Sequence, residues 1–251
     1  MKHLTILTGA SRGMGLALAE QLSSPDALLL CISRTTAASL DGLALARGAQ
    51  LLQWPADLAE SAGVAARVQA WLAGQDVARL ASATLINNAA VVGRLGPLDP
   101  AAPQDLATTL RVDLEAPMQL TAAFLSATRG WTVPKKILNI SSGLGRRPMA
   151  GGALYCAAKA GMDHYTRCVA LDEARHSHGT RIVALAPGVI DTDMQSTLRA
   201  GDPAGFPEHE GFVRMKESGV LTSPAEAARR VLAYLARKDF GDQPVADVRD
   251  A

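Results

Sequence analysis

Short apolar runs alternate with segments of helical periodicity along most of the chain. The apolar runs predict strands at residues 4–8, 27–32, 51–54, 84–87, 136–140 and 181–186. Apolar residues recur at helical spacing in residues 13–22, 64–72, 104–127 and 154–175. Continuous apolar strands separated by amphipathic helices are typical of a parallel sheet that is covered on both faces. The pattern therefore predicts an α/β fold with a doubly wound parallel sheet flanked by helices on both faces.

The last quarter of the chain is patterned less regularly. Ser223-Pro224-Ala225-Glu226 has the sequence of a capping box with proline at the first helical position, and it predicts a helix to about Arg237. Before it, residues 188–220 are interrupted by glycine and proline and show no clear period. Long loops in compact domains are commonly functional, so we expect a substrate lid within about 188–220.

Composition and charge narrow the class of protein. The chain has 251 residues, 48% of them hydrophobic, with a net charge of +1. We expect a single domain over residues 1–251, because α/β folds of this length are commonly one unit. We expect no nucleic-acid partner, because a net charge of +1 gives no strong electrostatic field to attract one. We expect no membrane partner either, because no apolar run reaches about 18 residues. Cys31, Cys156 and Cys168 show no C-x-x-C spacing, which indicates a reducing compartment and a cytoplasmic location.

The turn after the first predicted strand is rich in glycine and leads into a predicted helix. Glycines let the backbone approach a pyrophosphate closely, and the helix N-terminus offers free N–H groups and a positive dipole end. In this context the turn predicts a Rossmann-type dinucleotide site. The expected contacts are Gly9, Ser11, Arg12, Gly13, Met14 and Gly15.

The same turn also matches the G-x-S-x-G pattern of serine hydrolases, with Ser11 at its centre. In those enzymes several strands normally precede the pattern, whereas one predicted strand precedes Ser11. Phosphate binding is therefore the favoured interpretation, and hydrolysis is kept as an alternative.

The end of the second predicted strand indicates which dinucleotide is bound. A fold that selects NAD carries an acidic residue about 20 residues past the glycine motif, to hold the ribose 2′-hydroxyl. Here that place carries Ser33, followed by Arg34. Arginine can grip a 2′-phosphate with two hydrogen bonds, so Ser33, Arg34 and Arg12 predict NADP(H). The alternative is that both arginines are solvated surface charges.

Tyr155 and Lys159 are four residues apart in a predicted helix, so their side chains share one face. A free phenol has a pKa of about 10. An ammonium about 4 Å away stabilises the phenolate by up to ~4 kcal/mol, which lowers that pKa by about three units. A surface pair has the same spacing, so the pattern alone leaves both interpretations open. Ser142 follows a predicted strand at the edge where ligands bind, and its hydroxyl can stabilise charge on a substrate carbonyl.

These motifs together resemble the short-chain dehydrogenase/reductase family. Thr8-Gly-x-x-x-Gly-x-Gly15, Asn87-Asn88-Ala89, Ser142, Tyr155-x-x-x-Lys159 and Pro187-Gly188-x-x-x-Thr192 occur in the family's order over nearly the whole chain. The resemblance implies that Tyr155 is the general acid, that Lys159 lowers its pKa and holds the nicotinamide ribose, and that Ser142 orients the carbonyl. It implies a homodimer or homotetramer, and further cofactor contacts from Asp57, Leu58, Asn88, Ala89, Pro187, Gly188, Val189, Ile190 and Thr192.

The chain departs from the family pattern at two positions. Ala90 stands where the family usually has glycine, and an extended backbone tolerates this change. Asp113 stands where the family usually has an asparagine that supports a water next to the lysine. A carboxylate there would hold Lys159 more firmly charged. We therefore count Asp113 among the catalytic residues.

Residues 191–195 resemble the sepiapterin reductase and benzil reductase branch of the family. Asp247 matches the position at which an aspartate anchors the pterin in sepiapterin reductase, although it could equally be a solvated carboxylate near a fraying chain end. We expect an NADPH-dependent reductase of a ketone or vicinal diketone, such as a pterin side chain or an aromatic diketone. The alternative is a catalytically silent NADP-binding regulatory protein. His176 and His178 lack a third ligand, so we expect no metal site.

Overall fold

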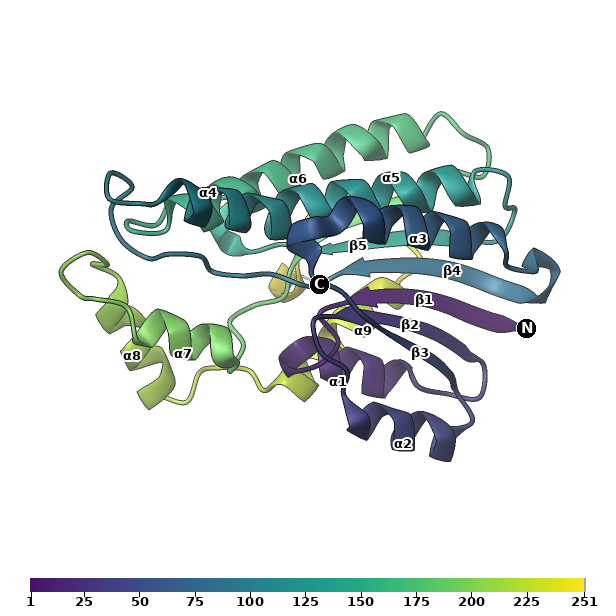
Figure 1. The fold of residues 1–251 in the computed structure, drawn as a ribbon, viewed down its shortest axis with the longest axis horizontal. Coiled ribbons are helices and arrows are strands. Elements are labelled where there is room, and N and C mark those ends of the chain that lie inside the picture. The colour runs from purple at the N-terminus through teal and green to yellow at the C-terminus, as the bar shows by residue number, and fades with distance from the viewer. Residues whose placement is uncertain (251) are drawn as a thin grey trace.

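The computed structural model describes residues 1–250, and its seven strands form one parallel sheet (Figure 1). The order across the sheet is β3-β2-β1-β4-β5-β6-β7. The direction of winding reverses between β1 and β4, and ligands bind at such a switch point beyond the carboxyl ends of the strands. The strands are β1 (Lys2–Thr8), β2 (Ala27–Ser33), β3 (Gln50–Pro55), β4 (Leu80–Asn87), β5 (Lys135–Ile140), β6 (Arg181–Ala186) and β7 (Val245–Asp247).

Helices cover both faces of the sheet, as predicted (Figure 1). One face packs against α1 (Gly13–Leu22), α2 (Ala38–Arg47) and α9 (Pro224–Ala236). The other packs against α3 (Ser61–Ala73), α5 (Ala116–Thr128) and α6 (Ala153–Glu173).

Alternate residues of the central strands fill the two cores. Ile6 and Leu7 are neighbours on β1 and both are buried, but Ile6 belongs to the core under α3 and α5, and Leu7 to the core under α1 and α9. Successive side chains of a strand point to opposite faces, so a strand that is covered twice must be apolar throughout. This requirement explains why the strands were evident in the sequence as uninterrupted apolar runs.

The structure corrects the helix that the sequence predicts over residues 104–127. Two α-helices occupy this segment, α4 (Pro103–Leu110) and α5, and a π-helical turn over Arg111–Glu115 joins them. A π turn inserts one residue into the helical repeat and is common at functional sites. Asp113 lies in this turn and is fully buried.

The weakly patterned segment 188–220 contains two short helices, α7 (Asp193–Arg199) and α8 (His209–Glu217). Figure 1 shows them beyond the carboxyl ends of the strands, apart from the helices that cover the sheet. They pack on a small hydrophobic core that is separate from the two cores of the sheet. Its buried residues are Val92, Met149, Leu198, Phe206 and Phe212. The lid remains a prediction, and the expectation of a loop without regular structure was wrong.

The capping box before α9 is confirmed, since Ser223 Oγ accepts a hydrogen bond from the Glu226 N–H at 3.2 Å. The strand β7 and the helix α2 were not predicted. Among residues 1–250, the helices are all too short or too polar to cross a lipid bilayer.

Candidate active site

A cavity of about 1290 Å³ lies across the carboxyl ends of the strands. At one end it is lined by Ser33, Arg34 and Asp57, and at the other by Ser142, Tyr155 and Asp247. It is large enough for a dinucleotide with a small substrate beside it. Every site residue that the sequence predicts lines this cavity except Asp113, which is buried behind it.

The glycine-rich turn has the geometry of a phosphate cradle. Gly9 and Gly13 have φ of 70° and 55°, the left-handed region that favours glycine. A Cβ on Gly15 would lie 1.9 Å from the Gly9 carbonyl oxygen, so the turn and the first turn of α1 can pack this closely only without a side chain there. No side chain caps the N-terminus of α1, which leaves its N–H groups available to a phosphate.

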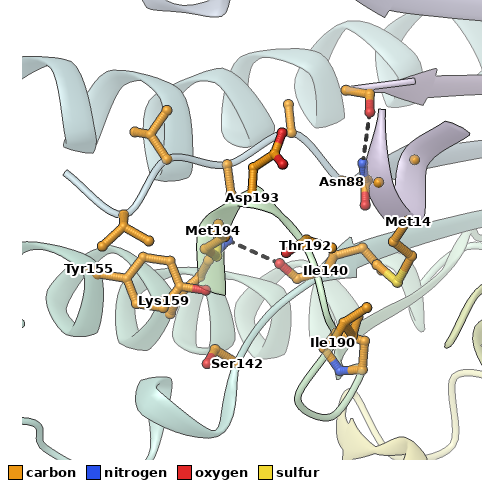
Figure 2. A pocket seen from close by; sticks show the side chains of 18 of the residues that line it. Met14, Asn88, Ile140, Ser142, Tyr155, Lys159, Ile190, Thr192, Asp193 and Met194 are labelled. Atoms are coloured by element: carbon orange, nitrogen blue, oxygen red, sulfur yellow. Dashed lines mark hydrogen bonds between the residues drawn. The ribbon is translucent and has the colours of Figure 1, made fainter. Parts of the chain in front are cut away.

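Asn88 joins this turn to the end of β4. Its Nδ2 donates to the Thr8 carbonyl at 2.9 Å, and its backbone N–H donates to Thr8 Oγ1, also at 2.9 Å. Figure 2 shows Asn88 at the edge of the cavity. Ala90 follows without backbone strain, since every residue of positive φ in the described chain is a glycine. The Ala90 departure is therefore accommodated, as expected.

The two arginines predicted to bind a 2′-phosphate differ in their surroundings. Arg34 is exposed at the end of β2, where it lines the cavity beside Ser33. Arg12 Nη1 instead pairs with Asp193 Oδ2 at 2.9 Å, at the start of α7. Both side chains of this pair are about 70% exposed, so the pair is weak and readily exchanged. Arg34 is the better placed of the two to receive a phosphate.

Tyr155 and Lys159 lie one turn apart on α6, and both are buried in the cavity wall (Figure 2). Lys159 Nζ lies 5.5 Å from the centroid of the Tyr155 ring and donates a hydrogen bond to the Ile140 carbonyl at 3.1 Å. Ser142 begins a 3₁₀ turn at the end of β5, and its Oγ accepts a hydrogen bond from the Leu144 N–H at 3.2 Å. The three side chains face one cavity, as the predicted chemistry requires.

Asp113 is the counter-ion of Lys159. Its Oδ2 lies 3.6 Å from Lys159 Nζ, an ion pair without a direct hydrogen bond, and its Oδ1 accepts the Val91 N–H at 2.7 Å. Burial raises the pKa of Asp113 to about 6, and the charge of Lys159 opposes this rise. At neutral pH the carboxylate form therefore predominates and faces the ammonium.

The expected lowering of the Tyr155 pKa by Lys159 is not found in this structure. Burial, together with the charge of Asp113, raises the pKa of Tyr155, while the Ser142 hydroxyl opposes the rise. The phenol is therefore protonated at neutral pH, which is the form that a proton donor requires. The sequence could not foresee this result, because spacing gives proximity to Lys159 but not the degree of burial.

Replacing Asp113 with asparagine is expected to move the alkaline limb of the reduction rate to lower pH. The substitution removes a negative charge that raises the pKa of Tyr155, so the phenol loses its proton at lower pH. We expect a shift on the order of one pH unit in the kcat profile. Asp26→Asn is the control, because Asp26 is exposed and lies just before the amino end of β2, away from the cavity. An unchanged profile in Asp113→Asn would refute the electrostatic role.

Asp247 is buried in the sheet, so the alternative of a solvated carboxylate at the chain end is wrong. It lies on β7, in register with Ala186 of β6, and is 5% exposed. Arg249 donates three hydrogen bonds to it, from Nη2 at 2.6 Å, from Nε at 2.8 Å and from the backbone N–H at 2.9 Å, and these bonds lower the pKa of Asp247. The predicted substrate contact is thus a paired carboxylate in the cavity wall.

The sequence missed several residues at the substrate end of the cavity. Arg146 and Arg249 form a polar side together with Asp247. Three apolar side chains of one hydrophobic cluster also line the cavity, namely Met149, Leu198 and Phe212. The i, i+3 spacing of Phe212 and Met215 was the one local signal for a helical face, and it is too short to show that α8 reaches the cavity.

Comparisons with known proteins identify the family of the chain. A family model described as short chain dehydrogenase matches residues 3–203. Benzil reductase ((S)-benzoin forming) of Bacillus cereus is 34% identical over 235 residues, which cover 94% of each chain. Sepiapterin reductase of Xenopus tropicalis is 34% identical over 92% of this chain and 90% of its own. The crystal structure of a short-chain dehydrogenase/reductase from Burkholderia vietnamiensis is 34% identical, has a TM-score of 0.64, and the match covers 99% and 98% of the two chains.

The parallel sheet, the glycine-rich cradle and the Ser-Tyr-Lys cavity define an oxidoreductase that uses a nicotinamide cofactor and acts on carbonyl or CH–OH groups. The chain belongs to the short-chain dehydrogenase/reductase family, and within it is similar to the benzil and sepiapterin reductases. This confirms the resemblance that the sequence motifs carry.

Proposed function

We propose that the protein is an NADPH-dependent carbonyl reductase whose substrate is a ketone with a neighbouring carbonyl, such as an aromatic diketone or a pterin side chain. The observation that carries the proposal is the shared cavity of Ser142, Tyr155 and Lys159, with a protonated phenol in its wall. A regulatory protein that only binds nucleotide has no need of a proton donor at this place. The similarity to benzil and sepiapterin reductases supports the substrate class.

Each residue has a distinct task in the proposed reaction. A bound nicotinamide supplies the hydride to the carbonyl carbon. The Ser142 hydroxyl donates a hydrogen bond to the carbonyl oxygen, and Tyr155 transfers its proton to that oxygen as negative charge develops. The ammonium of Lys159 stabilises the phenolate that remains, and Asp113 lies beside the lysine as its counter-ion.

The choice of NADPH rests on the end of β2. Ser33 and Arg34 present a hydroxyl and a guanidinium to the cavity, and an acidic residue that would repel a 2′-phosphate is absent at these two positions. The cavity wall also fits the substrate class, because Met149, Leu198 and Phe212 can pack against an aromatic ring.

We further propose a cytoplasmic homodimer or homotetramer. Leu110, Met118 and Leu171 are apolar and 39%, 46% and 72% exposed on α4, α5 and α6. Exposed apolar side chains on neighbouring helices favour association with a second copy. The three cysteines are free thiols, which fits a reducing compartment.

The proposal is tested by mixing the protein with NADPH and benzil, and by following the absorbance of the reduced cofactor together with the formation of benzoin. We expect NADPH to be consumed in equal amount to the benzoin formed. NADPH that binds without turnover of any diketone or pterin would favour the regulatory alternative. Hydrolysis of an activated ester that is lost in Ser11→Ala would instead favour the hydrolase.

A further inference from the structure

A third buried polar side chain continues the row that Tyr155 and Lys159 form on α6. Asp163 follows Lys159 by four residues, so the three side chains share one face of the helix. Asp163 is 2% exposed. A buried carboxylate is costly unless its oxygens are paired, so its partners indicate what it stabilises.

Both carboxylate oxygens of Asp163 accept hydrogen bonds from the loop that carries Ser142. The Ser141 hydroxyl donates to Oδ1 at 2.5 Å, and Arg146 Nε donates to Oδ2 at 3.1 Å. These two partners lie on either side of Ser142 in the sequence, so one carboxylate holds the loop at both ends. The loop is thereby anchored to the helix that also carries Tyr155.

Close packing leaves this loop little freedom to adjust. A Cβ on Gly145 would lie 2.9 Å from the backbone of Lys159 and 3.2 Å from Asp163 Oδ2, so the loop rests directly on α6. Arg146 Nη2 also donates to the Ala246 carbonyl at 2.8 Å, which extends the network to β7. A break at Asp163 would therefore release the loop at the substrate end of the cavity.

We propose that Asp163 is a positioning residue, which holds the Ser142 hydroxyl at the substrate carbonyl by clamping Ser141 and Arg146 against α6. The inference rests on the proposed function, because it assigns to Asp163 the orientation of a group that acts on the carbonyl. Asp163 lies outside the cavity lining and acts through Ser142. Misplacement of a reacting group by about 1 Å can reduce a rate by about 10²-fold.

The test is a double-mutant cycle between Asp163 and Ser142. Asp163→Asn keeps the size of the side chain and an acceptor for Ser141, but it loses the bond to Arg146. In the wild-type background we expect kcat for benzil reduction to fall by about 10- to 100-fold, while the Kd for NADPH stays unchanged. In a Ser142→Ala background the same substitution is expected to change kcat by less than about twofold, because the group that it orients is already gone.

A second variant tests whether the loss of kcat in Asp163→Asn comes from the broken clamp or from a loss of folded protein. Ser141→Ala removes one of the two clamps and leaves the carboxylate paired with Arg146, so we expect a loss of about 3- to 10-fold that also vanishes in the Ser142→Ala background. Asp172→Asn, an exposed position on α6, is the matched control and is expected to leave kcat unchanged.

The outcomes separate this inference from the proposed function. If the fold-loss in kcat of the double variant equalled the product of the losses from Asp163→Asn and Ser142→Ala, Asp163 would act independently of Ser142. That result would overturn the positioning role. An unchanged kcat in both Asp163→Asn and Ser141→Ala would overturn it as well. A wild-type protein that consumes no NADPH with any carbonyl substrate would overturn the proposed function, and this inference with it.

Discussion

Tyr155→Phe is expected to reduce kcat for carbonyl reduction by about 10³-fold and to leave the Kd for NADPH within about twofold of the wild-type value. The substitution deletes one hydroxyl from the cavity wall and keeps the ring that packs there. Burial holds that hydroxyl protonated at neutral pH, so its loss removes the proton donor without removing a charge. Stopped-flow measurement of NADPH oxidation gives kcat, and cofactor fluorescence gives Kd.

Tyr165→Phe is the matched control for this prediction. Tyr165 lies on the same helix but does not line the cavity. We expect it to retain wild-type turnover. If Tyr155→Phe also retained the wild-type rate, the assignment of the general acid would be wrong.

Arg34→Asp is expected to abolish or reverse the preference for NADPH over NADH. In the wild type we expect NADPH to bind about 10- to 10²-fold more tightly, since a charge-assisted arginine–phosphate contact contributes about 1.5–3 kcal/mol. An aspartate there would repel the phosphate and could accept a hydrogen bond from a ribose hydroxyl instead. The measurement is the Kd of each reduced cofactor by fluorescence titration.

The control for the cofactor prediction is Arg79→Asp. It makes the same change of charge just before the amino end of β4, whereas the cavity lies at the carboxyl ends of the strands. It is expected to leave the ratio of the two Kd values unchanged. Equal binding of NADPH and NADH by the wild type would refute the argument from Ser33 and Arg34.

The repeating part of the fold could be predicted because it follows from local physical requirements. Strands covered on both faces must be apolar throughout, and glycine is required where the backbone turns with positive φ or packs against another backbone, as at Gly9 and Gly15. The i, i+4 spacing of Tyr155 and Lys159 fixes a common helix face whatever the rest of the chain does. These features place the glycine-rich turn, Tyr155 and Lys159 at one cavity in the structure, while their roles in binding and catalysis stay predictions.

The parts that were missed depend on contacts between distant segments. Residues 245–247 become a strand because β6 offers an unpaired edge, and three residues are too few to show a period. The π turn at Asp113 could not be predicted because apolar residues recur at helical spacing in α4 and again in α5. The five residues of the turn between them are too few to show a different period. The raised pKa of Tyr155 and the pairing of Arg12 with Asp193 arise from burial and from the docking of α7, which sequence spacing does not encode.

In the proposed complex, one cavity brings a substrate carbonyl to Ser142 and Tyr155 while the 2′-phosphate of the cofactor reaches Arg34. A crystal structure of the complex with NADP and benzoin tests it most directly. We expect a ligand oxygen about 2.6–3.2 Å from both Ser142 Oγ and the Tyr155 hydroxyl, with the 2′-phosphate paired to Arg34. A ligand bound away from these two hydroxyls, or a cofactor whose phosphate faces solvent, would contradict it.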